Sequence, residues 1–122
     1  QTVINMPTTD FQKIIRDMTG ISDRIEIKSV GNDLIFYCEG NFASSRIYRS
    51  ESGGNMEFVN KPDATTVVQG EFSLKSLSHF IKCTPLCSNL EIYIGNDLPF
   101  IVKYDVASLG AIKLCLASLP SS

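Results

Sequence analysis

The 122-residue sequence lacks most of the features that identify a membrane protein, a secreted protein or an enzyme. It has no run of 18 apolar residues and no basic start followed by an apolar block and a cleavage site, so we expect a soluble protein that is not exported. It also lacks a G-x-S-x-G sequence and a phosphate-binding loop, and it contains one histidine. We therefore expect no enzymatic activity and no cofactor.

An excess of positive charge is also missing. The chain has 11 Lys and Arg against 13 Asp and Glu, a net charge of −2, which argues against a dedicated nucleic-acid-binding protein. Any contact with DNA must then come from a local cluster of basic side chains. With 43% hydrophobic residues, this length is expected to form one globular domain over residues 1–122.

Two of the four cysteines and the one histidine lie in the stretch HFIKCTPLC, where His79, Cys83 and Cys87 are four residues apart. Zinc requires four converging ligands, but no fourth lies nearby and Pro85 interrupts the helix that would align the three. His79 and Cys83 are one helical turn apart, but no orienting group or oxyanion loop accompanies them. We expect buried, reduced cysteines, no metal and no catalytic residue. A stand-alone thiol or zinc-binding protein is the alternative.

The two halves of the chain resemble each other. Gly-Asn-Asp-Leu occurs at residues 31–34 and 95–98, each time between runs of alternating apolar residues, which is typical of a hairpin turn. A helical pattern precedes each turn. We predict two repeats of one strand, one helix and three strands, at about residues 1–52 and 64–118. The stretch SESGGNMEFVNKPDA between them is predicted to be a loop.

Two helices and eight strands are expected. Thr9 and Gln12 suggest a capping box that starts the first helix, Gly20 its end, and Ser73 the start of the second helix. The apolar positions repeat at helical spacing, at Phe11, Ile14, Ile15 and Met18 and again at Leu74, Leu77 and Ile81. The expected strands cover residues 2–6, 24–29, 34–39, 46–50, 66–72, 90–95, 100–106 and 111–117. The predicted class is α+β, with both helices on one face of a mostly antiparallel sheet.

Basic residues lie on the polar face of both expected helices, at Lys13 and Arg16 in the first and at Lys75, His79 and Lys82 in the second. No acidic residue occurs from 73 to 89. Either helix alone could present an ordinary solvated face. Two repeat-related helices on one side of a sheet instead favour a shallow basic surface that touches phosphates without reading bases.

Several separated segments resemble, in order, the C-terminal domain of the proliferating cell nuclear antigen (PCNA) family, the eukaryotic DNA sliding clamps. They are INMPTTDFQKIIRDM, SLSHFIKCTPLCSNLEI and NDLPFIVKYDVASLGAIKLCLA, and the resemblance that they carry extends over essentially the whole chain. The resemblance implies a non-catalytic DNA polymerase processivity factor of the nucleus. Three two-domain subunits close a ring around duplex DNA, with the sheets outside and the basic helices lining the hole.

The resemblance also implies partners. A clamp loader places such rings on DNA, and polymerases, nucleases and ligases of replication and repair bind them through a short peptide motif. A checkpoint-clamp subunit, which would form its ring with two different chains, is the alternative within the same fold. The first clamp domain and the interdomain linker are expected to lie outside this sequence, which therefore carries only part of a ring subunit.

By similarity, Lys13, Arg16, Lys75, His79 and Lys82 would face DNA. The peptide pocket would include Leu98, Pro99, Phe100, Ala117 and Ser118, although Leu98 and Pro99 could simply close a hairpin. The subunit-interface strand would include Ser45, Arg46, Ile47, Tyr48 and Arg49, although the two arginines could equally guard an ordinary edge. The tail LASLPSS departs from the Ala-Pro and acidic end of the family, and Gly31, with Lys28 nearby, occupies the position of the family's modifiable lysine.

Overall fold

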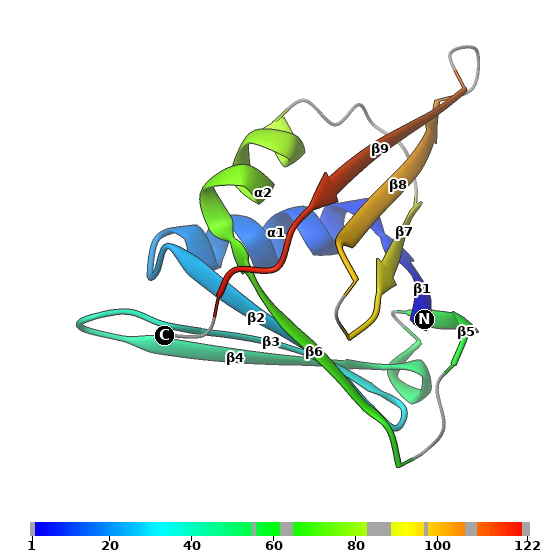
Figure 1. The fold of residues 1–122 in the computed structure, drawn as a ribbon, viewed down its shortest axis with the longest axis horizontal. Helices are drawn as coiled ribbons and strands as arrows, with labels where there is room; N and C mark the ends of the chain where they lie inside the picture. The colour runs from blue at the N-terminus through cyan, green and yellow to red at the C-terminus, as the bar shows by residue number, and fades with distance from the viewer. Residues whose placement is uncertain are drawn as a thin grey trace.

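A computed structural model of the chain describes residues 2–54, 56–61, 65–82, 89–96, 98–106 and 110–120, apart from the side chains of residues 105 and 106. Two helices and two antiparallel sheets form an α+β fold (Figure 1). The elements in chain order are β1 Thr2–Pro7, α1 Thr8–Thr19, β2 Arg24–Val30, β3 Asp33–Glu39, β4 Ser44–Ser50, the 3-10 helix η1 Glu51–Gly53, β5 Glu57–Asn60, β6 Val67–Ser73, α2 Leu74–Lys82, β7 Asn89–Ile94, β8 Phe100–Val106 and β9 Gly110–Leu116. Neither described helix is long and apolar enough to cross a membrane.

The strands form two sheets where one was predicted. Their orders are β5-β1-β7-β8-β9 and β4-β3-β2-β6, and every pairing is antiparallel. The first strand of each half joins the sheet of the other half, because β1 pairs with β7 and β6 pairs with β2. The orders β1-β7-β8-β9 and β6-β2-β3-β4 then match position by position, which supports the proposed duplication.

One continuous core joins the helices to both sheets. The helical stripes predicted from spacing are buried, as are the alternate residues of β1, β2, β3 and β7. The Phe11 and Phe36 rings meet edge to face at 6.4 Å between centroids, and Phe72 and Phe100 lie 4.8 Å apart. Phe11 and Phe36 join α1 to the four-stranded sheet, and Phe72 and Phe100 join the two sheets to each other.

The predicted loop between the repeats contains a strand, so this part of the prediction is wrong. Strand β5 pairs with β1 at the edge of the five-stranded sheet, and Met56 just before it is buried. The Glu51 carboxylate accepts hydrogen bonds from the Phe58 backbone N–H at 3.0 Å and from Lys61 Nζ at 3.1 Å. The glycines at 53 and 54 thus mark only the turn before the strand.

The predicted capping box at Thr9 is also wrong. Helix α1 begins at Thr8 directly after Pro7, and no side chain caps it. Proline is suited to this position because its fixed φ leads into the first turn and its missing N–H would have had no partner in the helix. In α2 the Ser76 backbone N–H donates to Ser73 Oγ at 3.2 Å, in agreement with the predicted start. Gly31 has φ 57° in the β2–β3 turn, in agreement with the predicted hairpin.

Candidate functional site

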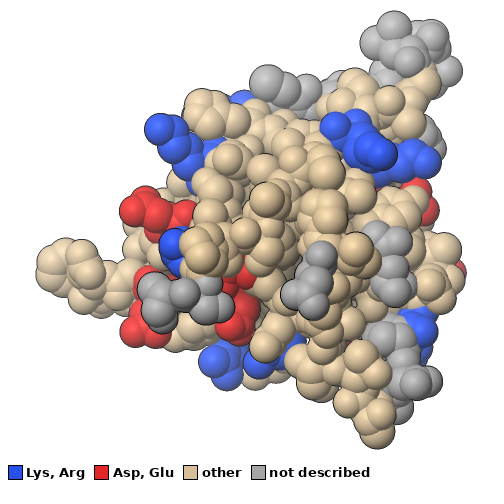
Figure 2. Space-filling view, viewed as in Figure 1, with Lys and Arg blue, Asp and Glu red and all other residues tan. Residues whose placement is uncertain are grey.

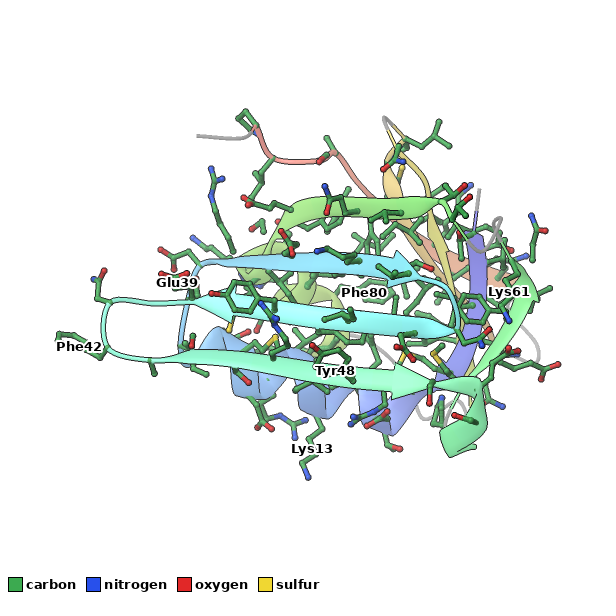
Figure 3. All side chains as sticks on the ribbon, turned by 90° about the horizontal axis from the view of Figure 1, so that it is seen from below. Lys13, Glu39, Phe42, Tyr48, Lys61 and Phe80 are labelled. Carbon is green, nitrogen blue, oxygen red and sulfur yellow. The ribbon has the colours of Figure 1, made fainter. Side chains whose placement is uncertain are left out.

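Helices α1 and α2 lie side by side and present the predicted basic residues to solvent. The helices are joined by a hydrogen bond from Gln12 Nε2 to the Ile81 carbonyl, 3.5 Å long. The five predicted basic positions are exposed, namely Lys13, Arg16, Lys75, His79 and Lys82. Figure 3 shows Lys13 pointing away from the four-stranded sheet. The structure thus places these five residues on two adjacent helices, with their side chains outside the core.

Acidic side chains do little to neutralise this surface. Helix α2 contains none, and α1 contains Asp10 and Asp17. The Asp10 carboxylate is held by Arg49, with Nε to Oδ2 at 2.7 Å and Nη2 to Oδ1 at 2.8 Å. This hydrogen bond raises the pKa of Arg49 above its usual value. Asp17 is therefore the one acidic residue of the two helices whose charge faces solvent without a described ion pair.

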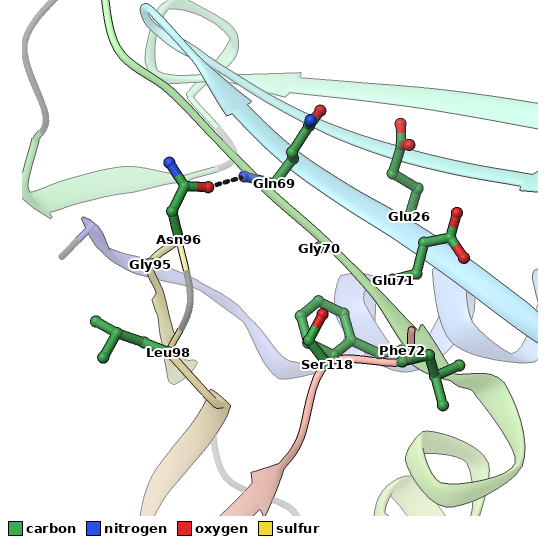
Figure 4. A pocket seen from close by; sticks show the side chains of 10 residues that line it. Glu26, Gln69, Gly70, Glu71, Phe72, Gly95, Asn96, Leu98 and Ser118 are labelled. Atoms are coloured by element: carbon green, nitrogen blue, oxygen red, sulfur yellow. Dashed lines mark hydrogen bonds between the residues drawn. The ribbon is translucent and has the colours of Figure 1, made fainter. Parts of the chain in front are cut away.

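A hollow of about 440 Å³ lies between β6, the β7–β8 turn and the chain after β9 (Figure 4). It contains two of the predicted peptide-pocket residues, Leu98 and Ser118. Its other lining residues are Glu26, Gln69, Gly70, Glu71, Phe72, Gly95, Asn96 and Leu119. Leu98 is a large apolar side chain that remains 45% exposed, so the hollow offers an apolar edge beside polar walls.

The remaining predicted pocket residues do not line this hollow. Phe100 is fully buried, with its ring tilted by 35° to that of Phe72, so the structure places this predicted pocket residue in the core. Pro99 and Ala117 are exposed nearby. Phe100 is buried because side chains alternate between the two faces of a strand, and Phe100 starts β8 on the face that points to the core.

Sequence reasoning missed the polar side of the hollow. The Gln69 backbone N–H donates to Asn96 Oδ1 at 3.1 Å, and Asn96 Nδ2 donates to the Val67 carbonyl at 3.0 Å. These bonds fix the β7–β8 turn against β6. One signal was present, because a glycine within a strand often marks close approach by another segment. A Cβ atom on Gly70 would lie 2.7 Å from the Phe72 ring and 3.4 Å from Ser118 Oγ.

The chain after β9 is held on the same side. The Leu119 backbone N–H donates to the Glu71 carbonyl at 2.8 Å. Arg24 Nη1 donates to Glu71 Oε2 at 3.0 Å and to the Pro120 carbonyl at 3.1 Å. Residues 117–120 are therefore attached to β6, next to the hollow.

The predicted interface strand is an edge strand. Strand β4 is the outermost strand of the four-stranded sheet, paired on one side with β3. Ile47 packs against the core and Arg49 is bound to Asp10, while Tyr48 is 55% exposed and Arg46 lies over the Tyr37 ring at 4.8 Å. Ser45 is half-buried. The unpaired backbone groups of β4 are therefore accessible to another strand.

The histidine and cysteine cluster is only partly described. His79 is exposed on α2, whereas Cys83 and Cys87 lie outside the described residues. Within the described part of the chain, no group of His, Cys, Asp and Glu has an arrangement that could hold a metal ion. Cys38 is buried, and burial raises the pKa of its thiol. Cys115 is exposed, so the expectation of buried cysteines is wrong at this position.

Comparison with known proteins gives consistent matches over nearly the whole chain. The sequence model of the family described as proliferating cell nuclear antigen, C-terminal domain, matches residues 1–119. A probable DNA polymerase sliding clamp 1 of Paramecium bursaria Chlorella virus 1 is 36% identical, over 98% of this chain and 46% of its own length. A probable DNA polymerase sliding clamp of Acanthamoeba polyphaga mimivirus is 30% identical, over 98% of this chain and 25% of its own length. The chain thus spans less than half of either relative.

Proposed function

Because this chain belongs to the PCNA C-terminal domain family, we propose that it is one domain of a DNA polymerase processivity clamp. In this proposal the domain has no catalytic role and forms part of a ring around duplex DNA. The observation that carries it is the pair of adjacent helices, whose basic side chains are exposed and whose opposite faces are buried in the core. A ring that slides needs weak contacts to phosphates and none to bases.

Two further surfaces suit the same role. Strand β4 supplies a free edge for a neighbouring subunit, and the hollow beside Leu98 supplies part of a site for a partner's peptide motif. The proposed partners are duplex DNA, polymerases, nucleases and ligases with such a motif, a clamp loader, and further clamp subunits that form a homotrimer at full length. The proposed location is wherever the DNA is replicated, which for the eukaryotic family is the nucleus.

A checkpoint-clamp subunit is the second candidate within the same fold. It would keep the basic helices and the free edge but would assemble with two different chains. The two functions can be distinguished by the mass of the ring that the full-length clamp assembles. Three identical chains would support the processivity clamp, and one copy with two different chains would support the checkpoint clamp.

The DNA contact can be tested with two variants of equal net charge. The first replaces Lys13, Arg16, Lys75 and Lys82 by Gln, and the control replaces Lys28, Lys61, Lys103 and Lys113 by Gln. The unmodified domain should bind a short duplex with a Kd of about 10⁻⁴ M or weaker, with affinity falling as salt rises. The helix variant should lose this binding, whereas the control should keep most of it. Equal losses in both would mean that overall charge, not the helices, determines binding.

A further inference from the structure

The outer face of the five-stranded sheet carries two lysines that oppose each other directly. Lys103 on β8 and Lys113 on β9 are register partners, so both side chains leave the same face of the sheet. Neither forms an ion pair with any described residue. Figure 2 shows a group of basic side chains over β8 and β9 on the visible face. Like charges in this arrangement destabilise a sheet, and an anion between them would relieve the repulsion.

The two lysines border a hollow of about 480 Å³ whose other lining residues are Tyr93, Ile101 and Ala111. This volume lies within the range of about 300–1,000 Å³ usual for ligand pockets. The hollow is separate from the one beside Leu98, and it combines an apolar floor with positive charge at its rim. On the neighbouring strand β7, Glu91 is the register partner of Lys103, and its carboxylate accepts a hydrogen bond from the Tyr93 hydroxyl at 3.3 Å.

We propose that this hollow, named here the outer-face site, binds a short segment of a partner protein with an acidic side chain next to an apolar one. The carboxylate would lie between Lys103 and Lys113, and the apolar side chain would cover Ile101 and Tyr93. Two lysines over an apolar floor suit such a peptide better than DNA, because DNA binding needs a row of basic side chains along the phosphate backbone. The site goes beyond the proposed clamp function and does not depend on contact between the helices and DNA.

The test uses a capped peptide of alternating leucine and glutamate, its leucine and glutamine counterpart, and the Lys103→Glu variant. We expect the acidic peptide to shift the amide NMR signals of Ile101, Lys103 and Lys113. The glutamine peptide and the variant should each weaken binding about fivefold or more. Lys103→Glu should leave the Tm nearly unchanged, because it turns the like-charge pair with Lys113 into an opposite-charge pair and the opposite-charge pair with Glu91 into a like-charge pair. Loss of binding would then not reflect unfolding.

A matched variant, Lys75→Glu, makes the same charge change on α2 and should leave peptide binding unchanged. Three outcomes would overturn the proposal. The glutamine peptide could bind as well as the acidic one, Lys103→Glu could leave binding intact, or inorganic phosphate could displace the peptide at similar concentrations. The last result would indicate a general anion site instead of a peptide site.

Discussion

At the scale of single residues, Gly40 is a position where the neighbouring backbone leaves no room for a side chain. A Cβ atom there would overlap the Ile21 backbone carbonyl, a contact made by backbone that cannot rotate away. Gly40→Ala should lower the free energy of unfolding by about 1–3 kcal/mol, the usual cost of overpacking. Urea denaturation followed by circular dichroism measures this change.

Gly20→Ala is the control for this prediction. Gly20 has φ −73° at the end of α1, and its added Cβ would lie 3.6 Å from the Asp17 carbonyl oxygen, an ordinary contact. This variant should be neutral or stabilising by about 0.4–1 kcal/mol, because alanine restricts the unfolded chain. If both variants lost equal stability, the close approach at Gly40 would not be the cause.

Glu51 gives a prediction for pH. Hydrogen bonds from the Phe58 backbone and from Lys61 lower the pKa of its carboxyl below the usual 4.5. Its stabilising effect is therefore fully present above that value and is lost as the pH falls through the lowered pKa. Wild type should have a higher Tm than Glu51→Gln at pH 7, and the difference should disappear in stronger acid. The control Glu57→Gln removes a charge from an exposed position of β5 and should show no such convergence.

At the scale of elements, the Arg49–Asp10 pair links the edge strand β4 to α1. Both side chains are only 25% and 21% exposed, and the contact has two hydrogen bonds, so it should stabilise more than a surface pair. A double-mutant cycle with Arg49→Gln and Asp10→Asn should give a coupling energy of about 1–2 kcal/mol. The Lys28–Glu26 pair at 4.0 Å, treated in the same way, should give less than about 0.5 kcal/mol. Equal couplings would contradict this assignment.

The tail after β9 gives a second prediction at this scale. Arg24 connects Glu71 to the Pro120 carbonyl, and the Leu119 amide bonds to β6 in the same place. Arg24→Gln should speed hydrogen exchange at the Leu119 amide without a large change in Tm, because the arginine is 43% exposed. Arg46→Gln, on the exposed side of β4, should leave that amide unchanged. An unaltered Leu119 amide in the Arg24 variant would mean that the backbone bond alone holds the tail.

The elements themselves were largely predictable because their signals are local. Apolar spacing placed both helices, and alternation placed eight strands to within one or two residues. Strand β5 was missed because EFVN is short and lies among glycines and a proline, which normally indicate a loop. The exchange of β1 and β6 between the two sheets could not be predicted from the sequence, because no local pattern indicates which distant strands pair.

At the scale of the whole molecule, one candidate site could be predicted from local sequence patterns and the other could be predicted only in part. The basic residues of the helices could be predicted because burial of one helical face exposes the other, and all five proved exposed. The peptide pocket was harder to predict from the sequence, because it depends on how β6, the β7–β8 turn and the tail come together. Leu98 and Ser118 line a common hollow, whereas Phe100 is in the core and Gln69 and Asn96 were not foreseen.

The proposed contact between the exposed faces of α1 and α2 and duplex DNA can be tested by an amide NMR titration of the ¹⁵N-labelled domain with a short duplex. We expect salt-sensitive shifts at Lys13, Arg16, Lys75 and Lys82. Little change is expected on β4 or on the outer face of β8 and β9. Shifts confined to those strands, or a micromolar complex insensitive to salt, would contradict the assignment of the helices as the DNA-facing surface.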